Sequence, residues 1–266
     1  YYSDEIAFDR RTRNIKSGEV IRIEDTDVGP MGLFSFNPKS KISARLLDLN
    51  SDAQIDQDWI KKQLHKALEL REELFDSAFF RLIHGEADGL PGVVIDRFGA
   101  NAVFQPNSSW ADCFKEQILD SLVSLGIQNI VLNGMSRARK LEGLDQTSEV
   151  VRGAIEKPIA VPMNGAVYFA DILNGQKTGL FFDQRVNHEF ASKLSKNREI
   201  LDVFSHEPIP KNSTFWDTPN LIITPHISSD SQGNYIEMVL KIFFKNLKLF
   251  IENKELINQI DRKLGY

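Results

Sequence analysis

Apolar and polar residues alternate along residues 18–49 in the way that half-buried β-strands require. Residues 18–24, 31–37 and 41–47 are three such runs, and the turn-forming residues 37–40 separate the second run from the third. We therefore predict a small barrel or sheet module in this part of the chain.

The pattern then changes to helical spacing over residues 56–75. Its apolar positions fall close to one face of a helix, and Asp56 or Asp58 can cap its first turn. The residues predicted to face the core are Ile60, Leu64, Leu68 and Phe75, with Ala67 and Leu74 beside them.

Alternation returns in residues 79–104, where two strands at 79–83 and 93–98 flank a glycine-rich loop. A helix at about 110–125 and a strand at 127–132 follow, and this β-β-α-β order is typical of an α+β domain. Gly85, Gly89 and Gly92 allow tight turns in the loop. Its acidic residues, Glu86 and Asp88, are expected to contact either a partner domain or RNA, or to form hydrogen bonds within the loop.

An Asn174-Gly175 pair lies between two runs that contain apolar residues, 167–173 and 176–185, and this pair predicts a β-hairpin. A helix at about 184–196 and a strand at 200–204 are expected next. Further on, residues 220–226 predict a short buried strand, and residues 234–253 predict a long amphipathic helix. If its apolar face stays exposed, this helix should favour self-association.

Composition and charge narrow the function classes. The chain has 266 residues, is 42% hydrophobic and 26% charged, and carries a net charge of −5. These values are typical of a globular protein that is not a broadly basic nucleic-acid binder. No apolar run approaches the length of a membrane span, so we expect a cytoplasmic protein without membrane contact. Because the sequence begins with Tyr1, we expect a short N-terminal piece to precede it.

Local basic clusters are the expected contacts for any RNA, although each cluster taken singly is better explained as solvated surface. The clusters are Arg10, Arg11, Arg13 and Lys16; Lys39, Lys41 and Arg45; and Arg137, Arg139 and Lys140. The single cysteine, Cys113, excludes an intramolecular disulfide, and we interpret it as a small buried residue rather than a nucleophile.

Three segments resemble the PUA-containing class I methyltransferases that use S-adenosylmethionine (SAM) to methylate cytosine C5 in large-subunit ribosomal RNA. Residues 32–47 are similar to the second half of the PUA domain. Residues 80–99 are similar to the signature of the central domain, and residues 176–185 to the segment that leads into the catalytic domain. The order and spacing agree over roughly three-quarters of the chain, that is, residues 1–204.

This resemblance implies structured ribosomal RNA as the partner, bound weakly, and SAM as the cofactor. Lys39, Lys41 and Arg45 in the PUA-like part, and Lys177 and Arg185 in the third segment, are the predicted RNA contacts. Asp183 is expected to hold one of these cations in place rather than to act in chemistry. The chain departs from the family at 187–188, where Asn-His replaces the commoner Asn-Arg.

The resemblance stops where SAM should bind. A glycine-rich turn must follow the first Rossmann strand, because side chains would block the approach of the cofactor to the backbone. Here the strand at 200–204 is followed by residues 205–213, and no glycine occurs between Gly179 and Gly233. We therefore expect that this chain does not bind SAM.

Residues 201–266 resemble the C-terminus of D-isomer-specific 2-hydroxyacid dehydrogenases instead. The resemblance assigns the acid/base histidine to His226 and its supporting glutamate to Glu207, a pairing that raises the pKa of an imidazole and fixes its tautomer. The glycine-rich turn that would bind NAD is also absent, as is the arginine that would anchor a substrate carboxylate.

The sequence thus predicts an α/β and α+β mosaic made of a PUA-like β-barrel, a central α+β domain and a truncated hybrid Rossmann-like remnant with a C-terminal helix. The expected domains are 1–55 (PUA-like), 56–183 (central), 184–204 (start of the methyltransferase Rossmann domain) and 205–266 (dehydrogenase-like). The function expected is RNA binding without catalysis by a methyltransferase relative. A fragment of an NAD-dependent D-2-hydroxyacid dehydrogenase is the alternative, and no metal is expected.

Overall fold

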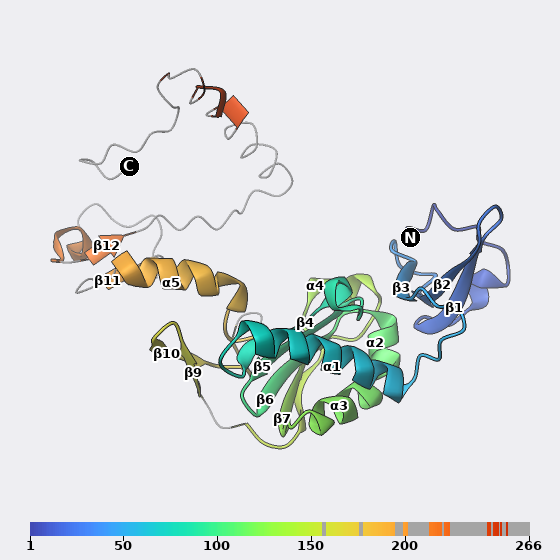
Figure 1. Ribbon diagram of the computed structural model, residues 1–266, viewed down its shortest axis with the longest axis horizontal. Helices are drawn as coiled ribbons and strands as arrows, with labels where there is room; N and C mark the ends of the chain where they lie inside the picture. Colours follow the sequence, from blue (N-terminus) through green and yellow to red (C-terminus); the bar gives the residue numbers. More distant parts are fainter. Residues whose placement is uncertain are drawn as a thin grey trace. The chain divides into compact units, whose positions relative to one another are not determined.

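The computed structural model describes residues 1–155, 158–175, 178–194, 199–201, 213–219 and 221–223, together with 244, 245, 247–249, 251 and 254. The chain divides into two compact units, residues 1–189 and 190–266. It is a mixed α/β protein with several sheets (Figure 1).

The first unit begins with a three-stranded antiparallel sheet in the order β1-β2-β3. Its strands are β1 (Glu19–Asp25), β2 (Gly29–Phe36) and β3 (Ala44–Asp48), and a short 3₁₀ helix, η1 (Thr12–Asn14), precedes them. The alternation of β1 separates its two faces: Ile21 and Ile23 pack on a small cluster around Phe34 and Phe36, whereas Val20 packs on the main core. The three predicted strands are therefore confirmed.

A long helix, α1 (Gln57–Leu74), follows this sheet. The side chain of Asp56 accepts a hydrogen bond from the Trp59 backbone N–H at 2.9 Å, which caps the first turn as predicted. Ile60, Leu64 and Leu68 are buried as expected, but Leu74 is 64% exposed, so the prediction that it lies beside the core is wrong. The helix ends at Leu74, where its last turn leaves the covered face.

The centre of the first unit is a five-stranded sheet in the order β4-β5-β6-β7-β8, in which only β6 and β7 run parallel. In Figure 1, α1 and α3 lie together over this sheet, and both contribute to the largest apolar cluster. The elements are β4 (Phe79–His84), η2 (Gly85–Asp88), β5 (Val93–Phe98), β6 (Asn101–Pro106), α2 (Ser109–Cys113), α3 (Lys115–Ser124), β7 (Asn129–Asn133), α4 (Arg137–Leu141) and β8 (Ser148–Arg152).

A β-hairpin covers part of the opposite face of this sheet. Its strands are β9 (Ile159–Met163) and β10 (Ala166–Ala170), joined by Asn164 and Gly165. Both turn residues have positive φ, at 55° and 74°, as the tightest hairpin turns require. The hairpin predicted at Asn174-Gly175 is wrong, because the side chain of Asp171 instead accepts hydrogen bonds from the backbone N–H groups of Leu173 and Asn174.

The end of the first unit leads through η3 (Phe182–Gln184) into α5 (Arg185–Leu194), which extends into the second unit. In the second unit, β11 (Glu199–Leu201) pairs in parallel with β12 (Leu221–Ile223), and η4 (Thr214–Asp217) lies between them in sequence. Residues 244, 245, 247–249 and 251 are helical, in agreement with the predicted helix. Among the described residues, no helix combines the length and apolarity that crossing a membrane would need.

Candidate nucleic-acid interface

The loop between β2 and β3 carries two of the predicted RNA contacts, Lys39 and Lys41, and both are exposed. The side-chain oxygen of Asn37 accepts hydrogen bonds from the Lys39 N–H at 3.1 Å and from the Ser17 hydroxyl at 2.9 Å. The Ser40 N–H donates to the Asn37 carbonyl at 3.1 Å, which closes the turn. The loop therefore has a defined conformation that directs both ammonium groups to solvent.

A buried carboxylate at the C-terminal end of α4 holds this loop in place. Glu142 is 7% exposed and accepts hydrogen bonds from Asn37 Nδ2 at 2.9 Å, Ser40 Oγ at 2.7 Å and Ser109 Oγ at 3.2 Å. We call these four residues the Glu142 latch. Charge-assisted hydrogen bonds are stronger than neutral ones, so the latch fixes the loop that carries Lys39 and Lys41 relative to the five-stranded sheet. We call this β2–β3 loop the lysine loop.

Arg45, the third predicted contact in this region, lies on β3 and is already paired. Its guanidinium lies 2.9 Å from Glu86 and 3.5 Å from Glu142, and its side chain is 19% exposed. Glu86 therefore pairs with a residue of β3 that lies far from its own loop in sequence. Because two carboxylates offset the charge of Arg45, Lys39 and Lys41 are the cations of this group that face solvent unopposed by any described carboxylate.

The two other basic clusters differ from each other. Arg10, Arg11, Arg13 and Lys16 are all exposed near η1. In the third cluster, Arg139 is buried, donates to the carbonyl oxygens of Pro106 and Asp145, and forms an ion pair with Asp112 at 2.6 Å. Arg139 is thus a structural residue, and only Arg137 and Lys140 of that cluster are exposed.

The glycine-rich loop between β4 and β5 is braced by Asp88. Both carboxylate oxygens of Asp88 pair with Arg71, at 2.6 and 2.7 Å, and the carboxylate also accepts the His84 N–H at 2.6 Å. Gly92, with φ of 74°, lies so close to Ser108 that a Cβ atom would be 2.6 Å from the serine Cβ. The loop thus requires glycine at this position for two physical reasons.

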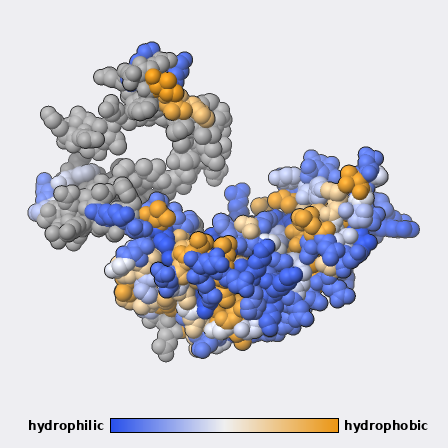
Figure 2. All heavy atoms as spheres, in the orientation of Figure 1, coloured by the Kyte–Doolittle hydropathy of each residue, from blue (hydrophilic) through white to orange (hydrophobic). Residues whose placement is uncertain are grey.

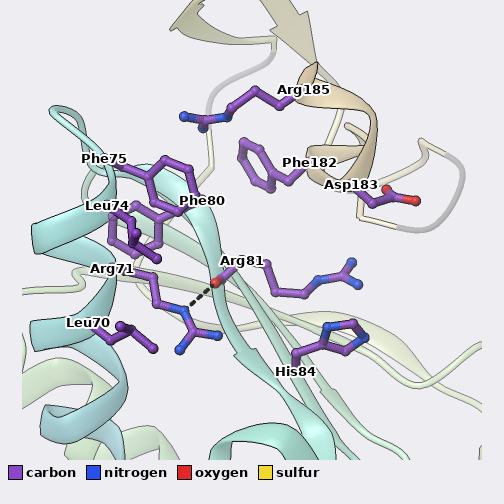
Figure 3. A pocket seen from close by; sticks show the side chains of 10 residues that line it. All are labelled: Leu70, Arg71, Leu74, Phe75, Phe80, Arg81, His84, Phe182, Asp183 and Arg185. Carbon is purple, nitrogen blue, oxygen red and sulfur yellow. Dashed lines mark hydrogen bonds between the residues drawn. The ribbon is translucent and has the colours of Figure 1, made fainter. Parts of the chain in front are cut away.

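Arg185 lies beside a small pocket formed by the end of α1, β4 and η3 (Figure 3). Its guanidinium is 4.4 Å from the ring centroid of Phe75 and 5.8 Å from that of Phe182, and it donates to the Phe79 carbonyl. Burial lowers the pKa of Arg185 from its usual value. The phosphate contact of Arg185 stays a prediction, and its observed contacts anchor the end of η3 to the sheet.

The pocket in Figure 3 encloses about 270 Å³, and its wall of stacked Phe75 and Phe80 rings is apolar. Exposed Leu70 and Leu74 lie at its rim, and Figure 2 shows hydrophobic residues over this end of α1. Arg185 already occupies the side of Phe75 that a planar ligand would need. We therefore interpret this pocket as a packing feature.

A second arginine, Arg81, is held by a fully buried carboxylate. Arg81 Nε and Nη2 donate to Asp96 at 2.8 and 3.1 Å, and the Thr178 hydroxyl donates to the same carboxylate. The hydrogen bonds to Asp96 raise the pKa of Arg81. This paired arginine stands at the edge of a larger cleft of about 580 Å³ on the sheet face that α1 and α3 do not cover.

Polar side chains from neighbouring strands line this cleft. The pairing of Val94 with Gln105, and of Asn133 with Ser148, places these residues in one row across the sheet. The residues that line the cleft are Arg81, Val94, Gln105, Asn133, Met135, Ser136, Ser148, Leu173, Asn174 and Gly175. Sequence reasoning missed the cleft because it did not predict β6 and β8. Only the pairing of β6 with β5 and β7, and of β8 with β7, brings the row together.

Three predicted site residues, Lys177, Glu207 and His226, lie outside the described residues. Cys113 is exposed, so the prediction that it is buried is wrong. Partial burial, and then the nearby charges of Asp112 and Glu19, raise the pKa of its thiol. A raised pKa leaves less thiolate at neutral pH, which agrees with the expectation that Cys113 is not a nucleophile.

The fold of this chain is similar to that of solved methyltransferases. It matches a protein from Streptococcus mutans described as a SAM-dependent methyltransferase, with a TM-score of 0.58 and 18% identity over 71% of this chain and 50% of that chain. It also matches a methyltransferase complexed with SAH, with a TM-score of 0.57 and 17% identity over 70% of this chain and 49% of that one.

Two sequence relatives identify the resemblance more closely. Ribosomal RNA large subunit methyltransferase I of Aliivibrio fischeri is 35% identical over 205 residues, which is 74% of this chain and 51% of the relative. The protein of the same name from Vibrio vulnificus is 32% identical over 203 residues, again 74% of this chain and 51% of the relative. The chain thus spans about half the length of the curated relatives it matches.

Residues 193–228 match a different family, the NAD binding domain of D-isomer specific 2-hydroxyacid dehydrogenases. The chain therefore resembles ribosomal RNA methyltransferases over about three-quarters of its length and 2-hydroxyacid dehydrogenases over a short later segment. Both resemblances predicted from the sequence are confirmed, and the dehydrogenase match covers residues 193–228 where 201–266 were predicted.

Proposed function

We propose that this chain binds structured ribosomal RNA without methylating it. The observation that carries this proposal is the likeness of three-quarters of the chain to ribosomal RNA large subunit methyltransferases. RNA is the substrate class in the names of those relatives, and a cytoplasmic location follows from such a partner.

The lysine loop supports the proposal as the principal contact. Lys39 and Lys41 are exposed, and the Glu142 latch fixes the loop that carries them. A pre-ordered loop loses little conformational entropy when it binds phosphates. We interpret the sheet β1-β2-β3, which has its own apolar cluster around Phe34 and Phe36, as the PUA-like module of this interface.

The absence of methylation is proposed because the residues present do not fit SAM. In the sequence, β11 is followed by side chains such as Phe204, His206 and Glu207 where a class I methyltransferase needs a glycine-rich turn. We interpret β11 and β12 as a Rossmann-like remnant. SAM is the cofactor class that the methyltransferase likeness suggests, and calorimetry should detect no binding of it. Micromolar affinity for SAM would disprove this part of the proposal.

Salt dependence of RNA binding is the direct test of the interface. For a hairpin of large-subunit ribosomal RNA, replacing Lys39 and Lys41 with alanine should weaken binding. It should also reduce the slope of log affinity against log salt by about 0.7–0.9 for each lost phosphate contact. The matched control is the alanine pair at Lys61 and Lys62, which are exposed on α1. Equal slopes for the two double variants would refute the lysine loop as the contact.

A dehydrogenase fragment is the second candidate, and the match of residues 193–228 is the observation that favours it. Glu207 and His226 lie within this match and would supply the proton in the reduction of a 2-oxo acid. The protein's main contribution to hydride transfer is placement of the nicotinamide, and the sequence has no glycine-rich dinucleotide turn. NADH oxidation in the presence of a 2-oxo acid, abolished by His226→Ala, would establish this candidate.

Self-association through the C-terminal helix is the remaining part of the proposal. Phe244, Leu247 and Ile251 are 60%, 42% and 71% exposed and are spaced as on one face of a helix. Light scattering on the full chain should show a concentration-dependent dimer, and Leu247→Glu should abolish it. A strictly monomeric chain over the whole concentration range would contradict this proposal.

A further inference from the structure

The face of the five-stranded sheet that α1 and α3 do not cover has an apolar part and a polar part. Under the β9–β10 hairpin, Phe98, Val103 and Val131 of the sheet are buried against Val161 and Met163. Further along β6 and β7, the same face carries Gln105 and Asn133. The hairpin does not extend over these residues, and the cleft of about 580 Å³ lies there.

The residues that line this cleft offer hydrogen-bond donors and acceptors without negative charge. Among the lining residues that the structure describes there is no aspartate or glutamate, and the cation among them, Arg81, is offset by Asp96. The amide of Gln105 presents both a carbonyl oxygen and an NH₂ group, whereas Asn174 Nδ2 already donates to Asp171 and Asn133 Oδ1 accepts the Met135 N–H. The chemistry therefore favours a ligand whose edge has donors and acceptors side by side, rather than a simple anion.

Two side chains of the cleft, Gln105 and Met135, are accessible to a ligand, and no packing or hydrogen bonding among the described residues requires their exposure. Gln105 is half-buried on β6, and its amide forms no hydrogen bond to any described residue. Met135, just before α4, is 59% exposed although it is apolar. A thioether makes favourable contacts with aromatic rings, and an amide reads the edge of a planar heterocycle. Together they suit the face and the edge of one nucleobase.

We propose that this cleft binds one unpaired nucleotide of a single-stranded RNA segment. Its base would pack between Met135 and Leu173, and its hydrogen-bonding edge would face Gln105 and Asn174. The row of polar side chains on an open sheet is accessible to a base that is splayed out of a helix, whereas a base pair within A-form RNA presents no free edge of this kind. This inference rests on the proposed RNA-binding function and adds a second contact to the lysine loop.

The volume and the mixed lining agree with such a ligand. Ligand pockets in proteins typically enclose about 300–1,000 Å³ and combine apolar walls with a few placed polar groups. Val94, Leu173 and Met135 supply the apolar walls of this cleft. Arg81 stands at its rim with Nη1 unused in the two hydrogen bonds to Asp96, so that nitrogen is available to a ribose or phosphate oxygen.

The experiment compares single-stranded and duplex RNA on the full chain. Fluorescence anisotropy with a labelled oligocytidylate should show that Gln105→Leu, which keeps the volume but removes the amide, weakens binding about tenfold. The same variant should leave duplex binding unchanged, because the lysine loop contacts phosphates only. The matched control is Gln117→Leu on α3, which lies on the helix-covered side of the sheet and should bind both RNAs as the unchanged chain does.

A second measurement separates this inference from the proposed function. Cytidine monophosphate is titrated into the unchanged chain, and the side-chain amide resonances of Gln105 and Asn174 are followed by NMR. Shifts confined to the cleft support the inference even if the chain binds no RNA longer than the mononucleotide. In that case only the proposed function fails. If the resonances do not move, the cleft is not a nucleotide site. Equal binding of single strands by Gln105→Leu and Gln117→Leu would show that the Gln105 amide does not contact the base. Where the two measurements disagree, the titration decides.

Discussion

The two faces of the five-stranded sheet differ in how completely they are covered. On the helix-covered face, Ile95, Phe104 and Ile130 are fully buried against α1 and α3. On the other face, the β9–β10 hairpin covers Val103 and Val131 but leaves the row that contains Gln105 open. The same strands thus form a continuous core on one side and a partly polar surface on the other.

This difference separates stability from binding in the first unit. Apolar burial is the dominant favourable term in folding, and it is concentrated on the helix-covered face. A polar row contributes little to that term and is costly to bury without partners, so it can remain only where water or a ligand reaches it. Substitutions on the two faces should therefore affect different measurements.

The largest effect is expected from two adjacent residues of β5 that point to opposite faces. Ile95→Ala should lower the free energy of unfolding by about 4 kcal/mol, because it leaves a cavity in a fully buried site. Val94→Ala, at the half-buried position on the open face, should lower it by less than about 1 kcal/mol. Urea unfolding followed by the fluorescence of the buried Trp59 and Trp110 measures both. Similar losses for the two variants would show that the open face is also part of the core.

The next effect is expected at the boundary between the apolar and polar parts of the open face. Asp96 is fully buried and bonded to Arg81 and Thr178, so Asp96→Asn leaves a half-buried guanidinium without its counter-charge. The expected loss is about 2–3 kcal/mol, less than for a fully buried pair because Arg81 reaches water. In a double-mutant cycle, Thr178→Val should cost less when combined with Asp96→Asn than it costs alone. Additive losses would contradict the shared network.

A smaller effect is expected from the Glu142 latch, which joins the lysine loop to the sheet. Glu142→Gln keeps the shape and one acceptor but removes the charge, and should cost about 1 kcal/mol. It should also increase hydrogen exchange at the N–H groups of Lys39 and Ser40, because the loop loses its anchor. Asp52→Asn, at an exposed ion pair with Arg22, is the control and should change neither quantity. Unchanged exchange in the loop would argue against the latch.

The fold was predictable where one face of an element is buried and the other is wet. The alternation in β1, and the Asp56 cap with its apolar stripe in α1, are signals of that kind. β6 was missed because Ala102, Val103 and Phe104 are buried on both faces, which removes the alternation. The hairpin was assigned to the wrong Asn-Gly pair because only tertiary pairing distinguishes the two.

The site was predictable only as far as it depends on local chemistry. Lys39 and Lys41 are recognisable as a basic cluster on a turn, and they are exposed as expected. The partners of Arg45 are far away in sequence, so its pairing with Glu86 and Glu142 has no local signal. Gln105 and Asn133 are likewise brought together only by the parallel pairing of β6 and β7.

The smallest effect is expected at Cys113 on α2. It measures how far water is excluded from the edge of the helix-covered side of the sheet. Its thiol contacts Gly18, where a Cβ atom would lie 2.6 Å from the sulfur, and partial burial raises its pKa. The thiolate is the nucleophile, so alkylation by iodoacetamide should be slower in the folded chain than in urea, with its half-maximal rate at a higher pH.

The fold favours the neutral form of the Cys113 thiol. The contribution of this preference to folding stability is therefore complete below the pKa that the thiol has in the unfolded chain. It is lost as the pH rises through the folded value. Glu19→Gln removes one of the charges that raise this pKa and should shift the midpoint slightly downward, whereas Glu24→Gln, exposed on the same strand, should not. A folded midpoint equal to that in urea would show that water reaches this edge as freely as it reaches the open face.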